Sequence, residues 1–217
     1  MGKGERGGSR TRYRRRMKTD PEALRRLMVE VRACRLCEAQ LPLGPRPVLR
    51  ADVRASVLIV GQAPGTRVHA TGVPWNDPSG DRLRAWLDVD RETFYDESRF
   101  AIIPAGLCYP GRGRSGDLPP RPECAPLWHP RLRALLPGIR LTLLVGQYAH
   151  AYYLGTRRKE TLTATVHAWE SYLPEFLPLP HPSPRNTRWL QVNPWFEREV
   201  VPELRFRAAE ALRIRLQ

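Results

Sequence analysis

The chain has 217 residues, enough for one domain with a sizeable core, and its 36 Lys and Arg against 22 Asp and Glu give a net charge of +14. This excess of positive charge predicts a polyanionic partner. No apolar run approaches the length of a membrane span, and none follows the N-terminal charges as in a secretory signal. We therefore expect a cytoplasmic protein that does not bind membranes and that associates with the nucleoid if its source is bacterial. We also expect it to be a monomer.

The first 19 residues predict a basic, disordered tail. Residues 1–18 contain eight Lys or Arg and one Glu, with Gly and Ser between them and almost nothing to bury. Such a tail either keeps the protein in solution or acts as an arm that adds phosphate contacts. Residues 20–217 then form the single folded domain.

Strands and helices alternate along the rest of the chain. Behind an Asp20 cap and a proline in the first turn, residues 21–33 have apolar side chains at helical spacing. Continuous aliphatic or β-branched runs predict buried strands. The predicted strands are 56–60, 100–103, 141–145 and 176–180, and the predicted helices are 21–33, 79–87, 123–136, 148–154, 161–172 and most of 188–216, interrupted near Pro194 and Pro202.

This alternation predicts an α/β fold, a single three-layer αβα domain with a central four-stranded parallel sheet. Ligands bind such sheets beyond the carboxyl ends of the strands. Three segments with unusual composition follow predicted strands and therefore meet at that edge. They are residues 61–65, Gly146-Gln147 and residues 181–186.

Two of these segments are informative about function. The sequence GQAPG at 61–65 is a turn whose glycines let backbone N–H groups approach a ligand. The sequence HPSPRN at 181–186 places an imidazole on a loop stiffened by two prolines. Together they resemble motifs 1 and 2 of the uracil-DNA glycosylase superfamily, and the resemblance covers about residues 30–190. It implies a glycosylase that flips uracil or a related deaminated base out of DNA and hydrolyses the N-glycosidic bond, in base excision repair.

The resemblance assigns roles in the site. Trp75, in the loop TGVPWNDPSGD at 71–81, corresponds to the aromatic residue on which the flipped base stacks. His181 corresponds to the donor that stabilises the departing base anion. The motif loops contain no lysine that could form a Schiff base, so we expect a monofunctional enzyme. Further expected substrate contacts are Gly61, Gln62, Ala63, Asn76, Ser183, Arg185 and Asn186.

The residue that holds the attacking water is harder to assign. Several families of the superfamily have Asp or Asn at the position of Ala63. Families 4 and 5 have Ala there, as this chain does. Residues 76–81 resemble a family 5 stretch that contains an Asp, which makes Asp77 the candidate catalytic carboxylate. Asp77 could instead cap the helix that opens at Ser79.

One position departs from the resemblance. Families 4 and 5 read the Watson–Crick edge of uracil with an Asn four residues before the third cysteine, where this chain has Pro104. Proline cannot donate a hydrogen bond. Either the backbone of residues 105–107 or Asn76 takes over this task, or the preferred base differs.

Four cysteines predict a metal site. Cys34 and Cys37 form C-x-x-C, and Cys108 and Cys124 flank a Pro- and Gly-rich loop. On chemistry alone, four thiolates suit either zinc or a [4Fe–4S] cluster. The order and spacing resemble the cysteines of families 4 and 5, which implies a structural [4Fe–4S] cluster, with structural zinc as the alternative.

Three other functions remain open at this stage. Because Pro104 stands in place of the Asn, a glycosylase for deaminated purines, hypoxanthine or xanthine, is one of them. A non-catalytic iron–sulfur protein that binds lesions in DNA is another. An iron–sulfur electron carrier is disfavoured, because a cluster between positive loops and a base pocket has no evident redox partner.

Overall fold

The computed structural model describes residues 20–114 and 116–213, so the predicted tail at 1–19 lies outside the described residues. Its centre is a four-stranded parallel sheet in the order β2-β1-β5-β6, as predicted. Neighbouring strands are in the registers Val57↔Phe100, Val57↔Leu141 and Thr142↔Phe176. The strands are β1 (Val57–Val60), β2 (Phe100–Ile102), β5 (Leu141–Val145) and β6 (Phe176–Leu179).

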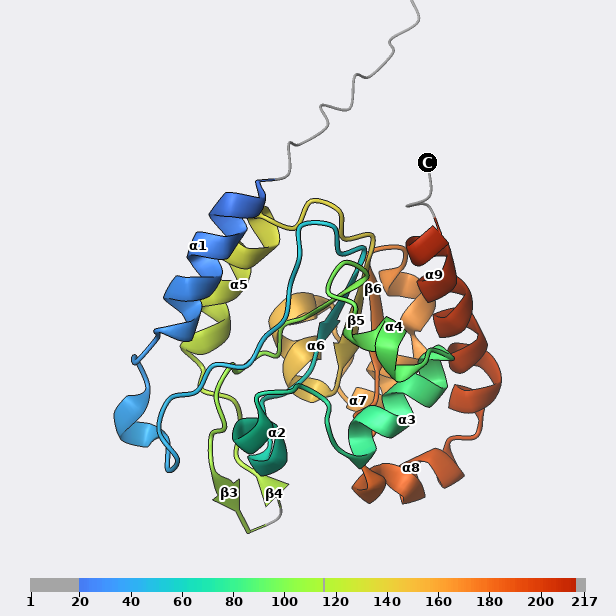
Figure 1. Ribbon diagram of the computed structural model, residues 1–217. Coiled ribbons are helices and arrows are strands. Elements are labelled where there is room, and N and C mark those ends of the chain that lie inside the picture. Colours follow the sequence, from blue (N-terminus) through green and yellow to red (C-terminus); the bar gives the residue numbers. More distant parts are fainter. Residues whose placement is uncertain (1–19, 115, 214–217) are drawn as a thin grey trace, which may run out of the picture.

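Helices cover both faces of the sheet and complete the predicted three-layer αβα arrangement (Figure 1). On one face lie α1 (Pro21–Arg32), α5 (Cys124–Ala134) and α6 (Gln147–Leu154). On the other lie α3 (Pro78–Leu87), α4 (Arg91–Tyr95), α7 (Leu162–His167) and α9 (Val201–Arg213). The strands are buried on both faces because each successive residue packs against a different helical layer.

The long predicted helices are confirmed with small shifts in their ends, and two are subdivided. The predicted helix 161–172 is α7 followed by the 3₁₀ helix η3 (Trp169–Tyr172). The segment 188–216 contains α8 (Thr187–Val192), the π-helical segment η5 (Phe196–Val200) and α9. Pro194 separates α8 from η5 as expected, whereas near Pro202 the helix changes from π to α hydrogen bonding without a break.

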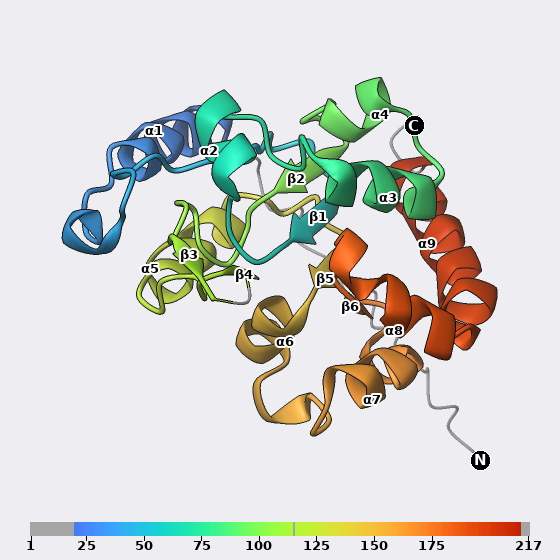
Figure 2. The same ribbon diagram turned by 90° about the horizontal axis from the view of Figure 1, so that it is seen from below.

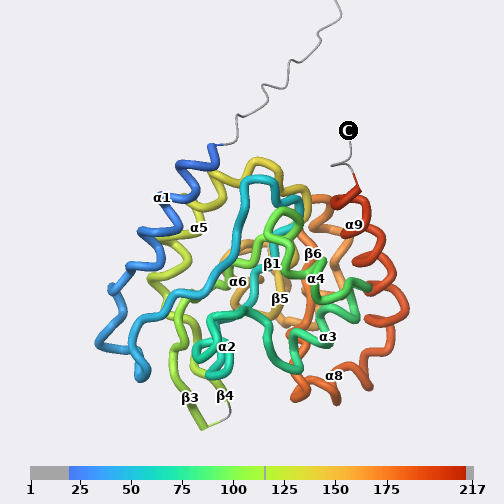
Figure 3. The backbone as a smooth tube through the Cα atoms, viewed as in Figure 1, coloured from blue at the N-terminus to red at the C-terminus, as the bar shows by residue number. Residues whose placement is uncertain are grey.

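Short elements were missed because they have too few turns or residues to show a period. They are α2 (Thr66–Thr71), α4, the 3₁₀ helices η1 (Glu38–Gln40), η2 (Gly155–Arg157) and η4 (Pro184–Asn186), and a two-stranded antiparallel hairpin of β3 (Arg112–Gly113) and β4 (Gly116–Asp117). Figure 3 traces the irregular segment that leads from η1 to β1 along the edge of the sheet, where Arg50 pairs with Ile102 of β2. Seen from below in Figure 2, α2, the hairpin and α8 surround the carboxyl ends of the strands. Among the described residues, no helix is both long and apolar enough to cross a membrane.

Candidate functional site

The loops that follow all four strands line one open cavity of about 710 Å³. Figure 2 looks onto this end of the sheet. Residues 61–65 contribute from behind β1, Pro104 from behind β2, Gln147 from behind β5 and His181 from behind β6. The cavity brings together most of the residues that the sequence had singled out, namely Gly61, Gln62, Ala63, Trp75, Asp77, His181, Ser183, Arg185 and Asn186.

Trp75 lies in the cavity with its indole over the backbone of Gly61. A Cβ at Gly61 would lie 2.8 Å from the indole Cζ2, so only glycine allows this close approach. The centroids of the Trp75 and His181 rings are 5.5 Å apart, with 32° between their planes. Trp75 itself has φ = 56°, in the left-handed region that a bulky residue rarely adopts. The aromatic predicted to support the base and the imidazole predicted to hold it are therefore direct neighbours.

The surroundings of His181 select one tautomer. The backbone N–H of Ser183 donates to His181 Nδ1 at 3.2 Å, so this nitrogen is the acceptor and Nε2 carries the proton. Asn186 Nδ2 donates to the His181 carbonyl at 2.8 Å and holds the loop. Although part of the ring reaches the cavity, burial lowers the pKa of His181, and the nearby Asp77 carboxylate offsets this only in part. At neutral pH the ring is thus an uncharged donor.

Asp77 caps α3 and also lines the cavity. Its Oδ1 accepts from the backbone N–H of Gly80 at 2.9 Å, which is an N-cap interaction. Oδ2 makes no hydrogen bond within the described residues. The cap therefore fixes the orientation of the carboxylate while leaving one oxygen for a water molecule, so the two predicted roles are geometrically compatible.

The loop 181–186 is fastened to α3. Arg82 donates to the Ser183 carbonyl at 3.1 Å and to Thr187 Oγ1 at 3.3 Å, and Ser183 Oγ accepts from the Arg185 N–H at 3.3 Å. The exposed Arg185 side chain reaches Gly116 in the hairpin, where a Cβ would overlap with its guanidinium. Motif 2 and the hairpin therefore form neighbouring parts of the cavity rim.

Two predicted readers of the base edge are engaged elsewhere. Asn76 does not line the cavity, and its Oδ1 accepts from Arg91 Nη2 at 3.0 Å. The N–H groups of Ala105 and Gly106 donate to the carbonyls of residues 61 and 62, at 2.9 Å and 2.8 Å, and that of Leu107 lies 3.3 Å from Cys124 Sγ. All three amides already have acceptors, so they are not available as donors in place of the missing Asn.

The cavity also contains polar residues that the sequence did not mark as contacts, among them Gln147, Tyr148 and Asp117. The first two open α6 directly behind β5, and the position of Gly146-Gln147 at a strand end was the available signal. Asp117 lies on the missed hairpin, so its sequence neighbourhood held no signal for it.

The four cysteines line a second cavity, together with Leu41, Pro45, Pro47, Leu107 and Trp128. Burial raises the pKa of Cys108 to about 11 and that of Cys124 to about 12. A free thiol would stay protonated there, whereas a bound metal would deprotonate it. The all-sulfur set is one that zinc and iron–sulfur clusters prefer. Within the described residues, however, no three His, Cys, Asp or Glu side chains are grouped as ligands of a single metal ion.

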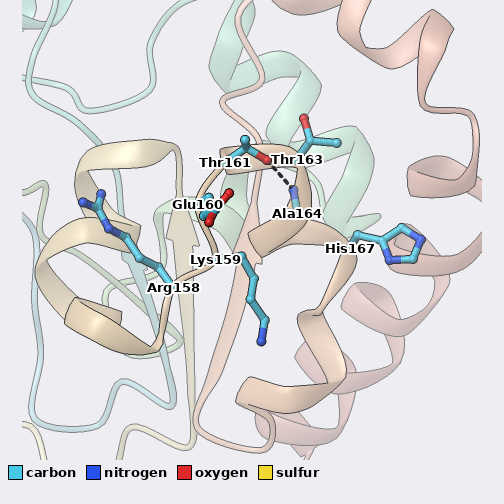
Figure 4. A pocket seen from close by; sticks show the side chains of 7 residues that line it. All are labelled: Arg158, Lys159, Glu160, Thr161, Thr163, Ala164 and His167. Atoms are coloured by element: carbon cyan, nitrogen blue, oxygen red, sulfur yellow. Dashed lines mark hydrogen bonds between the residues drawn. The ribbon is translucent and has the colours of Figure 1, made fainter.

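A larger hollow of about 840 Å³ lies beside α7 and shares no lining residue with the cavity at the strand ends (Figure 4). It is open to solvent and lined mainly by exposed side chains from 158–167. The hydrogen bond drawn there, from the Ala164 N–H to Thr161 Oγ1 at 3.0 Å, is the ordinary cap of α7. None of the residues that the sequence predicts for the site lines this hollow, so the cavity at the strand ends remains the candidate site despite its smaller volume.

A comparison with protein families shows the superfamily in which this constellation occurs. Residues 49–205, more than half of the chain, match the family model of the uracil DNA glycosylase superfamily. The chain belongs to this superfamily. Membership supports a DNA glycosylase at the level of the family, acting on DNA, and the parallel sheet with its flanking helices is consistent with the fold of the superfamily.

Proposed function

We propose that this chain is a monofunctional DNA glycosylase that excises uracil, or a closely related deaminated base, from DNA. The observation that carries this proposal is the neutral His181, which shares the cavity with Trp75 and Asp77 and whose Nε2–H makes no hydrogen bond within the described residues. A preorganised donor suits a base that leaves as an anion, because its fixed N–H stabilises the developing negative charge without reorganising during the reaction.

The reaction uses few groups of the protein. The flipped base stacks on the Trp75 indole, and the carboxylate of Asp77 orients a water molecule towards C1′ of the deoxyribose. The bond between C1′ and the base nitrogen breaks, and its electron pair leaves with the base, whose oxygen accepts from His181 Nε2. Water adds to C1′ and loses a proton, and the base anion takes a proton from solvent. The products are the free base and an abasic site.

The charge of the chain supports binding to the DNA backbone. The net charge is +14, and Arg185 stands on the cavity rim, where it can enter the space left by the flipped nucleotide or contact a phosphate. The phosphate contacts make affinity fall steeply with salt.

We further propose that the four cysteines hold a [4Fe–4S] cluster with a structural role. The segment between Cys108 and Cys124 carries the hairpin and Leu118, whose carbonyl accepts from Gln62 Nε2 at 3.2 Å. A group that ties both ends of this segment to Cys34 and Cys37 therefore also steadies one wall of the base cavity. When bound, the cluster supplies a covalent crosslink, and no catalytic step requires it.

The test is purified full-length protein on single-stranded and duplex oligonucleotides that contain uracil, hypoxanthine or xanthine, followed by alkali to cleave abasic sites. We expect cleavage at uracil. Cleavage at hypoxanthine or xanthine alone would instead establish a purine glycosylase, and binding without any cleavage would establish a lesion-binding protein. Iron and zinc analysis of anaerobically purified protein tests the cluster, with about four iron atoms and a broad band near 400 nm expected. Stoichiometric zinc in a colourless protein would contradict it.

A further inference from the structure

Around Pro104, opposite His181, the wall of the cavity is apolar, and the side-chain nitrogen of the neighbouring Gln62 already donates to the Leu118 carbonyl. His181 follows the edge strand β6, and Pro104 follows the other edge strand, β2, so the ends of β1 and β5 lie between them. Three strand spacings amount to about 14 Å, which accommodates one base ring and its contacts on either side. Around Pro104 the cavity is lined by Val48 and Ile102, both buried.

The backbone of this wall has no free donor. Pro104 has no N–H, and the amides of residues 105, 106 and 107 are engaged as described above. The preceding amide, of Ile103, donates to the Ile59 carbonyl at 3.0 Å, and that of Val48 donates to the Leu107 carbonyl at 2.7 Å. Every backbone N–H of 103–107 therefore points into the protein, apart from Pro104, which has none.

The Pro104 carbonyl is turned inward as well. It accepts from His129 Nε2 at 3.0 Å, and Nδ1 of the same ring then accepts from the hydroxyl of Tyr153 at 2.8 Å. His129 is 2% exposed, and burial lowers its pKa to about 4, so the ring is neutral and stays a donor to this carbonyl. This buried pair holds the Pro104 carbonyl behind the wall, on the side away from the cavity.

From this wall we infer that the site makes no hydrogen bond to N3 and O4 of the base, the two positions that pair with adenine, and that its substrates include uracil-like pyrimidines altered there, such as N3-alkylated or 4-substituted uracils. The inference rests on the proposed function. A base held by His181 on one side presents its opposite edge to Val48, Ile102 and Pro104. An apolar wall discriminates by size alone, typically by about 10- to 200-fold, whereas a site built to hydrogen-bond the same edge rejects an altered one by about 10⁴- to 10⁵-fold.

The experiment compares single-turnover cleavage of uracil, 3-methyluracil and 4-thiouracil in single-stranded oligonucleotides, so that duplex pairing does not affect flipping. All three bases can leave as the anion of the same ring nitrogen. We expect the two altered bases to be cleaved within about 200-fold of uracil. Cleavage of uracil with rejection of both altered bases by about 10⁴-fold or more would overturn the inference and leave the proposed function standing. Cleavage of none of the three would overturn the proposed function and this inference with it.

Two variants at one position test whether this wall is responsible. Pro104→Asn introduces an amide that can contact the edge, and we expect it to raise the preference for uracil over 3-methyluracil at least tenfold. The matched control, Pro104→Ala, removes the ring without adding a polar group, so the preference should stay close to that of the wild type. An equal change in both variants would show that loss of the proline ring, and not hydrogen bonding, sets the preference, which would contradict the inference. Thermal unfolding checks that each variant folds. If either variant does not fold, the cleavage rates of the wild-type protein on uracil and the two altered bases test the inference by themselves.

Discussion

Gly80, in the first turn of α3, lies directly against the backbone carbonyl of Trp75. A Cβ at residue 80 would overlap with that carbonyl oxygen, so only glycine fits. The same carbonyl accepts from Arg84 Nη1 at 3.4 Å, and the preceding carbonyl, of Pro74, accepts from the Tyr95 hydroxyl at 2.8 Å. A left-handed conformation at a tryptophan costs free energy of order 1–3 kcal/mol and persists only where its surroundings impose it. Helices α3 and α4 therefore set the position of the aromatic floor of the cavity.

Substitution of Gly80 tests this dependence. Gly80→Ala should displace the Trp75 backbone and slow single-turnover cleavage of a uracil oligonucleotide by at least tenfold, because the base loses a correctly placed stacking surface. The control is Ala85→Gly, at an exposed position of the same helix, which should cost about 1 kcal/mol of stability through helix propensity alone. An Ala85→Gly protein that lost as much activity as Gly80→Ala would show that general loosening of α3, and not the position of Trp75, explains the effect.

The parts of the fold that sequence could predict are those with a long or repeated signal. Buried strands such as Val57–Val60 are continuous aliphatic runs, and each is followed by a loop of distinctive composition, so both the sheet and the edge carrying the site follow from pattern. The hairpin of β3 and β4 has two residues in each strand and no such pattern. Asp117, which it places in the cavity, was missed for that reason.

Side-chain pairings were the second feature of the structure that the sequence could not predict. Asn76 stands beside Trp75 and Asp77 in sequence, yet its amide turns to Arg91, fifteen residues away, and no local pattern marks that partner. The left-handed backbone conformation at Trp75 turns the side chains on either side of it in different directions. In the same way, the engagement of the amides at 105–107 depends on loops that meet only in the folded chain.

Asp77 allows its two roles to be separated by chemistry. Asparagine caps helices about as well as aspartate, so Asp77→Asn should keep the melting temperature close to that of the wild type. The loss of charge beside the water should nevertheless slow single-turnover cleavage of uracil by roughly two orders of magnitude or more. Asp77→Ala should slow cleavage similarly and also cost about 1 kcal/mol of stability, since it removes the cap. Full activity in Asp77→Asn would reduce Asp77 to a helix cap.

Loss of one cysteine should affect the cavity through the loop it anchors. We expect Cys108→Ser to lose most of its iron, to melt at a lower temperature and to cleave more slowly, because the segment 109–123 with its Gln62 contact is no longer tied down at both ends. The control is Leu36→Ser, which changes an exposed side chain between Cys34 and Cys37 and keeps all four sulfurs. Iron analysis and thermal unfolding of the three proteins give the result, and undiminished iron in Cys108→Ser would remove that cysteine from the ligand set.

Two buried histidines should make the fold sensitive to mild acid. His129 and His150 are each 2% exposed, and burial lowers the pKa of both to about 4, from an ordinary value of 6.5. Between these values the unfolded chain binds a proton that the folded one does not, so stability is complete above about pH 6.5 and falls as the pH is lowered. Each histidine should cost roughly 2 kcal/mol of unfolding free energy between pH 7 and pH 5.

The clearer test is His150, whose Nε2 donates to the Leu144 carbonyl at 2.9 Å while its buried Nδ1 has no partner within the described residues. His150→Leu removes this titrating group and should reduce the loss of stability between pH 7 and pH 5 by roughly 2 kcal/mol, measured by urea unfolding at both pH values. The variant also loses the hydrogen bond to the Leu144 carbonyl, which lowers its stability at both pH values and therefore does not change the difference between them. An unchanged pH dependence in His150→Leu would show that this ring is not held neutral by burial.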